Sequence, residues 1–278
     1  MKIIKNSGDI VDFSRNKLKR SLLKSGASDS EAEDIVLAVE SQLTQGMSTR
    51  HIYRMAEKLL KKISAPHAAR YNLRTAIQQL GPAGFFFEKF VSLIFASEGY
   101  QVRNNLMLQG KCVSHEIDIV IRKNAVTTMI ECKFHAKNAS ISDVKVPMYI
   151  LSRFNDLKNK THRIFQNKDT IDDCKIVTNN RFSIDAETFA KCSGIDLLSW
   201  DYPKNDSLKT KIDDKALYPI TCLTTLTLVE KQKLLIMEII LVKQLIENTE
   251  ALFTIGISEG RQKNIINEAA GLCKYLIK

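Results

Sequence analysis

Carboxylates and a lysine fall close together in residues 115–135, which read HEIDIVIRKNAVTTMIECKFH. Carboxylates that face one another across a half-buried strand pair repel, and removal from water increases this penalty. A bound divalent cation relieves the conflict, and hard oxygen ligands suit Mg²⁺. A lysine beside such an ion could hold a phosphate group or position the attacking water. The spacing therefore indicates metal-dependent hydrolysis of phosphodiester bonds.

Two predicted strands must bring these side chains together. The runs 115–121 and 125–134 are rich in β-branched and apolar residues, and the polar residues 122–124 separate them. Side chains alternate between the two faces of a strand, so Glu131 and Lys133 project the same way. The segment therefore predicts a β-hairpin with one polar face.

Two registers of this hairpin are open. A turn at residues 123–124 would pair Glu116 with Glu131, whereas a turn at residues 124–125 would pair Asp118 with Glu131 directly. Both registers place all the acidic groups on the face that carries the lysine. The alternative is an exposed face with ordinary cross-strand ion pairs, which is the usual meaning of an isolated E-x-K.

The same residues resemble the PD-(D/E)xK nuclease superfamily, especially its Mrr-type restriction endonuclease and Holliday-junction resolvase branch. That pattern joins an acidic residue on a leading helix, an Asp at the end of one strand and an E-x-K on the next. Here Glu88 lies in GPAGFFFEKFVSLIFASEGY, Asp118 in HEIDIV, and Glu131 and Lys133 in ECKF. The resemblance spans roughly residues 81–200. It implies that the three acidic residues bind Mg²⁺ or Mn²⁺ and that Lys133 is catalytic; for Glu88 the alternative is a partly exposed position at the helix edge.

The flanking sequence predicts the rest of a mixed sheet covered by helices. Apolar residues at helical spacing indicate helices from Phe85 to Glu98 and from Ser142 to Lys160. Apolar runs predict three further strands, at 101–108, 174–178 and 195–200. A shorter helix is expected between the second and the third. Basic residues between 137 and 181, including Arg153, would attract a phosphate backbone without reading its sequence, or would simply line a solvated helix face.

Residues 1–80 predict a small α/β unit with a hairpin around residues 7–9 and four helices. The second helix begins with a capping box, in which Ser28 and Glu31 stand three residues apart. The third begins near Thr49, and the fourth begins near Pro66.

This stretch resembles the ATP-cone, a nucleotide-binding regulatory domain found on ribonucleotide reductases. The matching segments are I-I-K-N-S-G at 3–8, F-S-R-N-K at 13–17 and T-R-H-I at 49–52. The resemblance implies that Lys5 and Lys17 contact the triphosphate of ATP or dATP and that Thr49 lies near the nucleotide. Lysines and helix N-termini do favour phosphates. Asn6-Ser7 replaces the Arg-Asp of the family, which removes a cation, and the alternative is a cone that only mediates association.

The remaining sequence predicts a helical C-terminal module. Residues 202–214 are polar and predict a linker, and the chain is helical from about residue 224. A Gly256-Ile257-Ser258 segment faintly resembles a helix-hairpin-helix clamp for DNA, but a packing or dimerisation module fits the incomplete glycine pattern better. The predicted domains are 1–80, 81–203 and 204–278.

Composition favours a polyanionic partner. The chain has 278 residues and a net charge of +10, from 41 basic and 31 acidic residues. Its six cysteines form no C-x-x-C pair, so a cytoplasmic location is expected rather than a disulfide or zinc framework. The most apolar run, 226–246, is interrupted by charged residues and predicts a buried or partner-facing helix, with no membrane contact.

Together these features predict a nucleotide-regulated, Mg²⁺-dependent endonuclease that acts on double-stranded DNA as a homo-oligomer. The alternative is a nucleotide-sensing DNA-binding regulator with an inert nuclease fold. No G-x-x-x-x-G-K-[ST] motif is present, so an ATPase is not expected.

Overall fold

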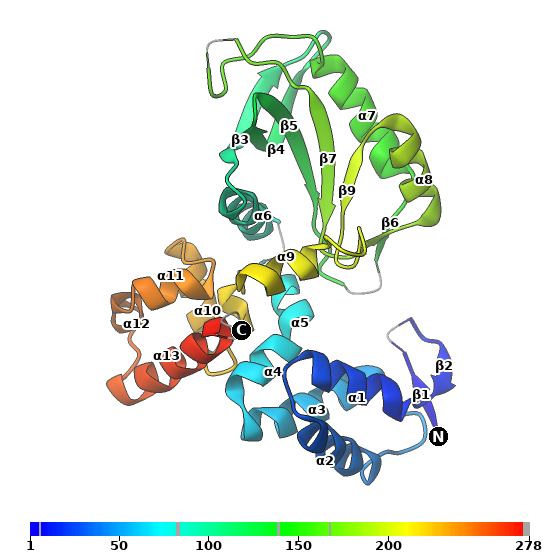
Figure 1. Ribbon diagram of the computed structural model, residues 1–278, viewed down its shortest axis with the longest axis vertical. Helices are drawn as coiled ribbons and strands as arrows, with labels where there is room; N and C mark the ends of the chain where they lie inside the picture. Colours follow the sequence, from blue (N-terminus) through cyan, green and yellow to red (C-terminus); the bar gives the residue numbers. More distant parts are fainter. Residues whose placement is uncertain (6, 82–83, 138–139, 167, 275–278) are drawn as a thin grey trace. The chain divides into compact units, whose positions relative to one another are not determined.

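The computed structural model describes residues 1–5, 7–81, 84–137, 140–166 and 168–274 (Figure 1). Asn6 of the predicted nucleotide hairpin and Pro82-Ala83 of the predicted domain boundary lie outside the described residues. The chain divides into two compact units, one formed by Met1–Ile77 with Tyr218–Lys278 and the other by Gln78–Leu217. The division into domains 1–80, 81–203 and 204–278 stays a prediction.

The central unit, Gln78–Leu217, contains the mixed sheet that the sequence predicts. Its strand order is β3-β4-β5-β7-β9, antiparallel from β3 to β5 and parallel from β5 to β9. A small parallel pair, β6 and β8, lies apart from it. The bounds are β3 Gln101–Gln109, β4 Ser114–Lys123, β5 Val126–Lys133, β6 Ile141–Ser142, β7 Asp173–Thr178, β8 Arg181–Phe182 and β9 Asp196–Leu198.

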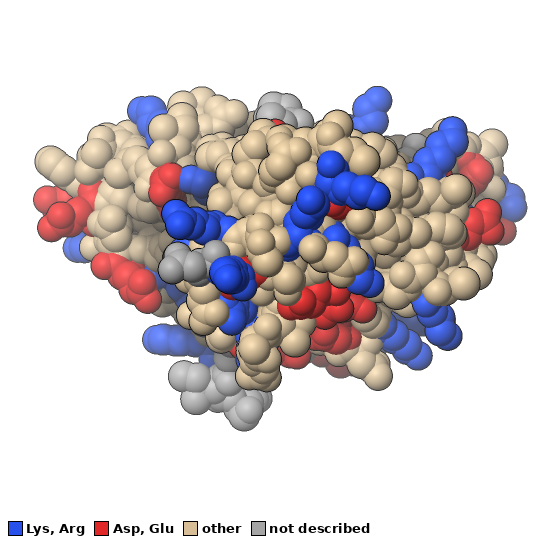
Figure 2. All heavy atoms as spheres, turned by 90° about the horizontal axis from the view of Figure 1, so that it is seen from above, with Lys and Arg blue, Asp and Glu red and all other residues tan. Residues whose placement is uncertain are grey.

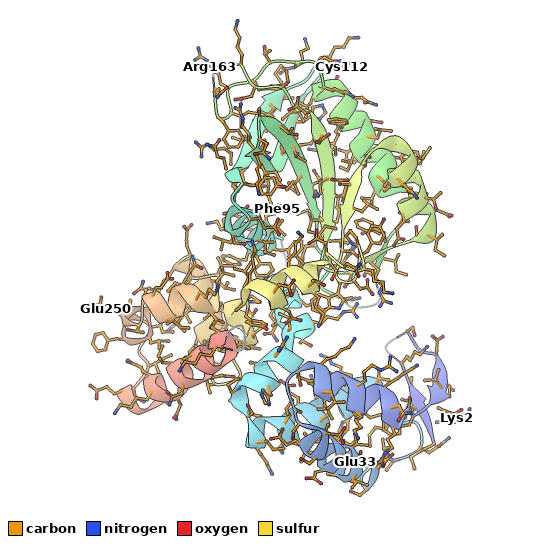
Figure 3. All side chains as sticks on the ribbon, viewed as in Figure 1. Lys2, Glu33, Phe95, Cys112, Arg163 and Glu250 are labelled. Atoms are coloured by element: carbon orange, nitrogen blue, oxygen red, sulfur yellow. The ribbon has the colours of Figure 1, made fainter. Side chains whose placement is uncertain are left out.

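Helices cover both faces of this sheet, with α7 and α8 on one side and α6 on the other (Figure 1). Phe154 of α7 packs with Val120 and Met129 of the sheet in one buried core. Phe95 of α6, labelled in Figure 3, is buried and meets Tyr100 edge-on with ring centroids 5.6 Å apart. The helices are α6 Phe85–Ser97, α7 Lys145–Leu157, α8 Ile184–Ser193 and α9 Leu208–Lys215.

The prediction of a linker over residues 202–214 is wrong for its second half. Ser207 caps α9 by accepting a hydrogen bond from the amide of Thr210. Lys211 is then nearly buried between Glu98 and Asp206, with both nitrogen–oxygen distances at 2.8 Å. Polar composition suggested a linker, but the ammonium group of Lys211 in α9 is paired with the carboxylates of Glu98 and Asp206.

The other unit begins with the predicted hairpin and helices. Ser28 and Glu31 form both hydrogen bonds of the capping box at the start of α2, as predicted. The helix expected from Pro66 is instead divided at Asn72 into α4 and α5. The elements are β1 Lys2–Ile4, β2 Ile10–Asp12, α1 Arg15–Lys24, α2 Asp29–Glu40, α3 Thr49–Ile63, α4 Ala65–Tyr71 and α5 Leu73–Gln78.

The C-terminal helices pack against α4 of the same unit, mainly through α13 (Figure 1). The apolar run 226–246 forms two short helices rather than one, because the chain turns between Met237 and Leu241. Across the described residues, no helix is both long enough and apolar enough to cross a membrane. The elements are η1 Ile220–Cys222, α10 Leu228–Ile236, α11 Val242–Glu247, α12 Glu250–Thr254 and α13 Glu259–Lys274.

Two glycines of α13 predict opposite effects of substitution by alanine. A Cβ at Gly271 would stand 2.5 Å from Cγ of Pro66, so Gly271→Ala should lower the free energy of unfolding by about 1–2 kcal/mol through overpacking. A Cβ at Gly260 would meet nothing within 4 Å, so Gly260→Ala should raise it by about 0.5–1 kcal/mol through helix propensity. Urea unfolding followed by circular dichroism measures both. Shifts of the same sign would contradict the close α4–α13 contact.

Candidate active site

The register of the β4–β5 hairpin places Asp118 across from Glu131. Ile119 pairs with Ile130 and Lys123 with Val126, so residues 124–125 form the turn. Both turn residues have positive φ, 52° and 66°, as a hairpin turn of type I′ requires. Of the two predicted registers, the turn at 124–125 is confirmed and the turn at 123–124 is wrong.

The strand ladder ends where the acidic pair begins. The last residue pair between β4 and β5 is Ile119 with Ile130. Beyond it, the side-chain carboxylate of Asp118 accepts a hydrogen bond from the backbone amide of Cys132 at 2.7 Å. Its side chain is thereby fixed against β5. Glu131 follows from the neighbouring strand and is only 5% exposed. We call the point where β4 and β5 stop pairing the fork between these strands. At this fork the carboxylates of Asp118 and Glu131 lie on neighbouring strands, the first held by a hydrogen bond and the second buried.

Two cations hold Glu131. Lys133 Nζ lies 2.6 Å from one carboxylate oxygen, which confirms that the two side chains share a face. Arg153 of α7 lies 2.6 Å from the other oxygen and also donates to the backbone carbonyl of Glu116. The ring of Tyr149 lies 5.7 Å from the Arg153 guanidinium. Charge-assisted bonds of this kind offset the cost of burying the Glu131 carboxylate.

Sequence reasoning missed the specific place of Arg153, which it counted only among the basic residues near the site. Arg153 stands between the buried residues Ile150 and Phe154 on α7. That position beside the apolar stripe was the available signal, because it brings the arginine close to the face of the helix that packs on the sheet.

Glu88 of α6 lies within the electrostatic field of the hairpin carboxylates. Burial raises the pKa of Glu88 to about 7, and repulsion from Asp118, Glu116 and Glu131 adds to the rise. Burial also raises the pKa of Asp118 to about 6, with repulsion from Glu131 next, although the Cys132 amide opposes the shift. Burial and mutual repulsion therefore both disfavour the charged forms of Glu88 and Asp118.

A cavity of about 310 Å³ opens beside the acidic pair. Glu88 and Lys133 are not among its lining residues, so they approach the pair from outside it. Its wall includes His115, whose Nε2 lies 2.8 Å from a carboxylate oxygen of Asp156. The lining is Ser114, His115, Glu116, Asp118, Glu131, Tyr149 and Arg153.

The donor chemistry of this site fits a divalent cation at Asp118 and Glu131. Both supply hard oxygen atoms, and a cation would favour the charged form of Asp118, whose pKa is raised first by burial and then by repulsion from Glu131. Among the described residues, however, no group of three His, Cys, Asp or Glu side chains is arranged to hold a metal. Glu131 turns instead toward Lys133 and Arg153. The part of Glu88 in metal binding stays a prediction.

The predicted nucleotide residues meet at a separate cavity of about 250 Å³ in the other unit. Lys5, Lys17 and Thr49 all line it, and Thr49 is the first residue of α3, where backbone amides favour anions. Tyr53 and Tyr71 stack in its wall with ring centroids 4.5 Å apart. The arrangement offers two ammonium groups for phosphates and an aromatic surface close by.

Family models match three successive parts of the chain. They are the ATP cone domain over residues 1–77, the restriction endonuclease over 82–202, and the AF1548-like C-terminal domain over 218–273. The first two matches agree with the resemblances drawn from the sequence, and the third falls on the C-terminal helices.

Two relatives are similar to about two thirds of this chain. An uncharacterized protein from Archaeoglobus fulgidus is 32% identical over 181 residues, which cover 63% of this chain and 95% of that protein. The crystal structure of AF1548, a protein of unknown function, has a TM-score of 0.56 at 29% identity and covers 68% of this chain and 97% of that one.

Proposed function

The chain belongs to the family of the uncharacterized Archaeoglobus fulgidus protein and carries an ATP-cone domain before a restriction endonuclease domain, and from this premise we propose that it is a nucleotide-regulated, metal-dependent DNA endonuclease. The observation that carries the proposal is the fork between β4 and β5. There Asp118 and Glu131 face each other at the edge of a cavity, with Lys133 bonded to Glu131.

Each residue of the site has a distinct part in the proposed hydrolysis. Asp118 and Glu131, together with Glu88, would hold Mg²⁺ or Mn²⁺, which when bound lowers the pKa of water and offsets charge on the phosphate. Lys133 orients the attacking water and the scissile phosphate. Arg153 keeps the Glu131 carboxylate in place through its bond at 2.6 Å.

Double-stranded DNA is the proposed substrate. A net charge of +10 favours a polyanion, although charge alone does not choose DNA over RNA. Figure 2 shows lysine and arginine side chains over the face seen from above, interspersed with acidic groups rather than joined in one stripe. Basic side chains spread in this way would contact a phosphate backbone without reading its sequence.

A substrate screen tests the proposal. Methylated, unmethylated, branched and single-stranded DNA are incubated with the full chain and Mg²⁺, each with and without ATP or dATP. Cleavage of at least one duplex substrate, lost when EDTA removes the metal, is the expected result. Absence of cleavage from every substrate in both Mg²⁺ and Mn²⁺ would contradict it.

If the cone binds a nucleotide, substitution of Lys17 should lower the affinity for ATP. Replacing Lys17 by glutamine should weaken ATP binding about tenfold, because one charge-assisted contact to the triphosphate is lost. Lys24→Gln, at the exposed end of the same helix, should leave binding unchanged. Isothermal titration calorimetry with ATP and with dATP measures both variants. Equal weakening by the two substitutions would mean that general charge, not the cavity, attracts the nucleotide.

One observation favours a second function, that of a DNA-binding regulator with an inert nuclease fold. Both carboxylate oxygens of Glu131 already have cationic partners, Lys133 and Arg153, so the charge of Glu131 is compensated without a metal. This function predicts DNA binding that is independent of metal and produces no cleavage. A homo-oligomeric assembly and a cytoplasmic location stay predictions under either function.

A further inference from the structure

A second cationic cavity, of about 280 Å³, lies in the unit formed by residues 1–77 and 218–278. It has no lining residue in common with the cone cavity around Lys17. One wall comes from α3 and the end of α4, and the other comes from the C-terminal helices. The lining is Arg54, Glu57, Lys58, Lys61, Asn72, Thr224 and Lys231.

Lys231 is the most unusual of these residues, because it is only 6% exposed. Its ammonium group donates to the carbonyl of Thr221 at 2.7 Å, and an ammonium can donate three hydrogen bonds. Burial lowers the pKa of Lys231, which expresses the cost of keeping this charge away from water, although the nearby carboxylates of Glu268 and Glu57 oppose the shift. A buried cation that faces a cavity is stabilised most directly by an anion inside that cavity.

The other charges of the lining leave the cavity strongly positive. Arg54, Lys58 and Lys61 follow one face of α3 at helical spacing, and Lys61 donates to the carbonyl of Thr224 at 2.6 Å. Within the described part of the chain, neither Arg54 nor Lys58 forms an ion pair with a carboxylate. Glu57 is the one acidic residue of the lining, and burial raises its pKa. Four basic side chains therefore surround one carboxylate.

We propose that this cavity binds a small phosphorylated ligand of nucleotide size. Its volume is close to that of the cone cavity, at about 280 against 250 Å³, which suits one compact molecule and is too small for a duplex. Lysine and arginine together are the side chains that recognise phosphate groups. The proposal concerns binding alone and does not depend on whether the chain cleaves DNA.

The position of this cavity also links it to the cone. Helix α3 carries Thr49 and Tyr53 in the cone cavity and Arg54 and Lys58 in the second cavity. The phosphorylated ligand would contact the ATP-cone through α3 and the C-terminal helices through Lys231. Both ligands would then contact the same helix, and any effect of one on the affinity of the other must be reciprocal.

Calorimetry with inorganic pyrophosphate tests the site. The full chain carries Lys17→Gln, which weakens the cone cavity, and is compared with the same chain that also carries Arg54→Gln or Lys58→Gln. Pyrophosphate should bind the parent chain, and each added substitution should weaken binding about tenfold. Lys62→Gln is the matched control, because Lys62 is exposed on α3 and lies outside the lining. Unchanged melting temperatures without pyrophosphate show that the variants are folded.

Three further outcomes decide the proposal. Binding of ADP as well as pyrophosphate, with no binding of adenosine, supports a site for the phosphates of a small molecule. Equal weakening by Lys62→Gln and Lys58→Gln would overturn it, since surface charge would then explain the binding. Binding of a single-stranded oligonucleotide without any binding of pyrophosphate or ADP would overturn it too, because a nucleic-acid surface would replace the small-ligand site.

Discussion

Replacing Lys133 by alanine is expected to reduce plasmid cleavage by about a thousandfold, because the side chain proposed to orient the water and the phosphate is lost. The same change removes the contact at 2.6 Å that holds Glu131. Asp118→Asn should reduce cleavage as strongly, since the carboxylate proposed as a metal ligand becomes a neutral amide. Initial rates of supercoiled plasmid nicking at saturating Mg²⁺ measure both effects.

Matched controls separate this loss from general changes of charge. Lys191→Ala removes a lysine from the exposed side of α8, and Asp214→Asn neutralises an exposed carboxylate of α9. Both should cleave at the rate of the unchanged chain. If Lys133→Ala and Asp118→Asn also cleave at that rate, the fork between β4 and β5 is not the active site. If none of the proteins cleaves but all bind DNA without metal, the inert regulator is the better description.

Replacing Glu268 by alanine should lower the free energy of unfolding by about 3 kcal/mol. Glu268 of α13 is only 2% exposed and accepts four hydrogen bonds from the segment that leads into α10. The donors are the amide and hydroxyl groups of Thr224 and Thr225, at distances from 2.5 to 3.0 Å. Alanine would leave two partly buried backbone amides without a protein acceptor.

Two further variants make this prediction specific. Glu268→Gln keeps the shape and one acceptor oxygen, so its loss of stability should fall between zero and that of alanine. Glu259→Ala changes an exposed glutamate at the start of the same helix and should cost less than about 0.5 kcal/mol. Denaturant unfolding measures all three. A Glu268→Ala protein as stable as the parent would show that the C-terminal helices do not depend on this contact.

The sequence was most informative where local rules decide the structure. The period of apolar residues predicted the elements of the central unit closely, including α6 at Phe85–Ser97 and β7 at Asp173–Thr178. Strand alternation alone placed Glu131 and Lys133 on one face. The capping box at Ser28 and Glu31 needed only residues three apart. In each case the interacting groups are neighbours along the chain.

Choices between similar local patterns were left open. The sequence allowed turns at 123–124 and at 124–125, and the pairing of β4 with β5 shows the second. The polar stretch before residue 214 suggested a linker, yet Lys211 reaches Glu98 of α6 and fixes a helix there. The helix at Lys211 depends on a partner far away in the chain, so no local pattern could decide it.

By itself, therefore, the sequence determined that Asp118, Glu131 and Lys133 lie on two neighbouring strands and share one face. Only the tertiary structure decided that Arg153 of α7 binds Glu131, that Glu88 lies within the field of the hairpin carboxylates, and that α3 and Lys231 enclose a cationic cavity. The physical reason is that burial and charge pairing are properties of the folded surroundings, which residues distant along the chain create together.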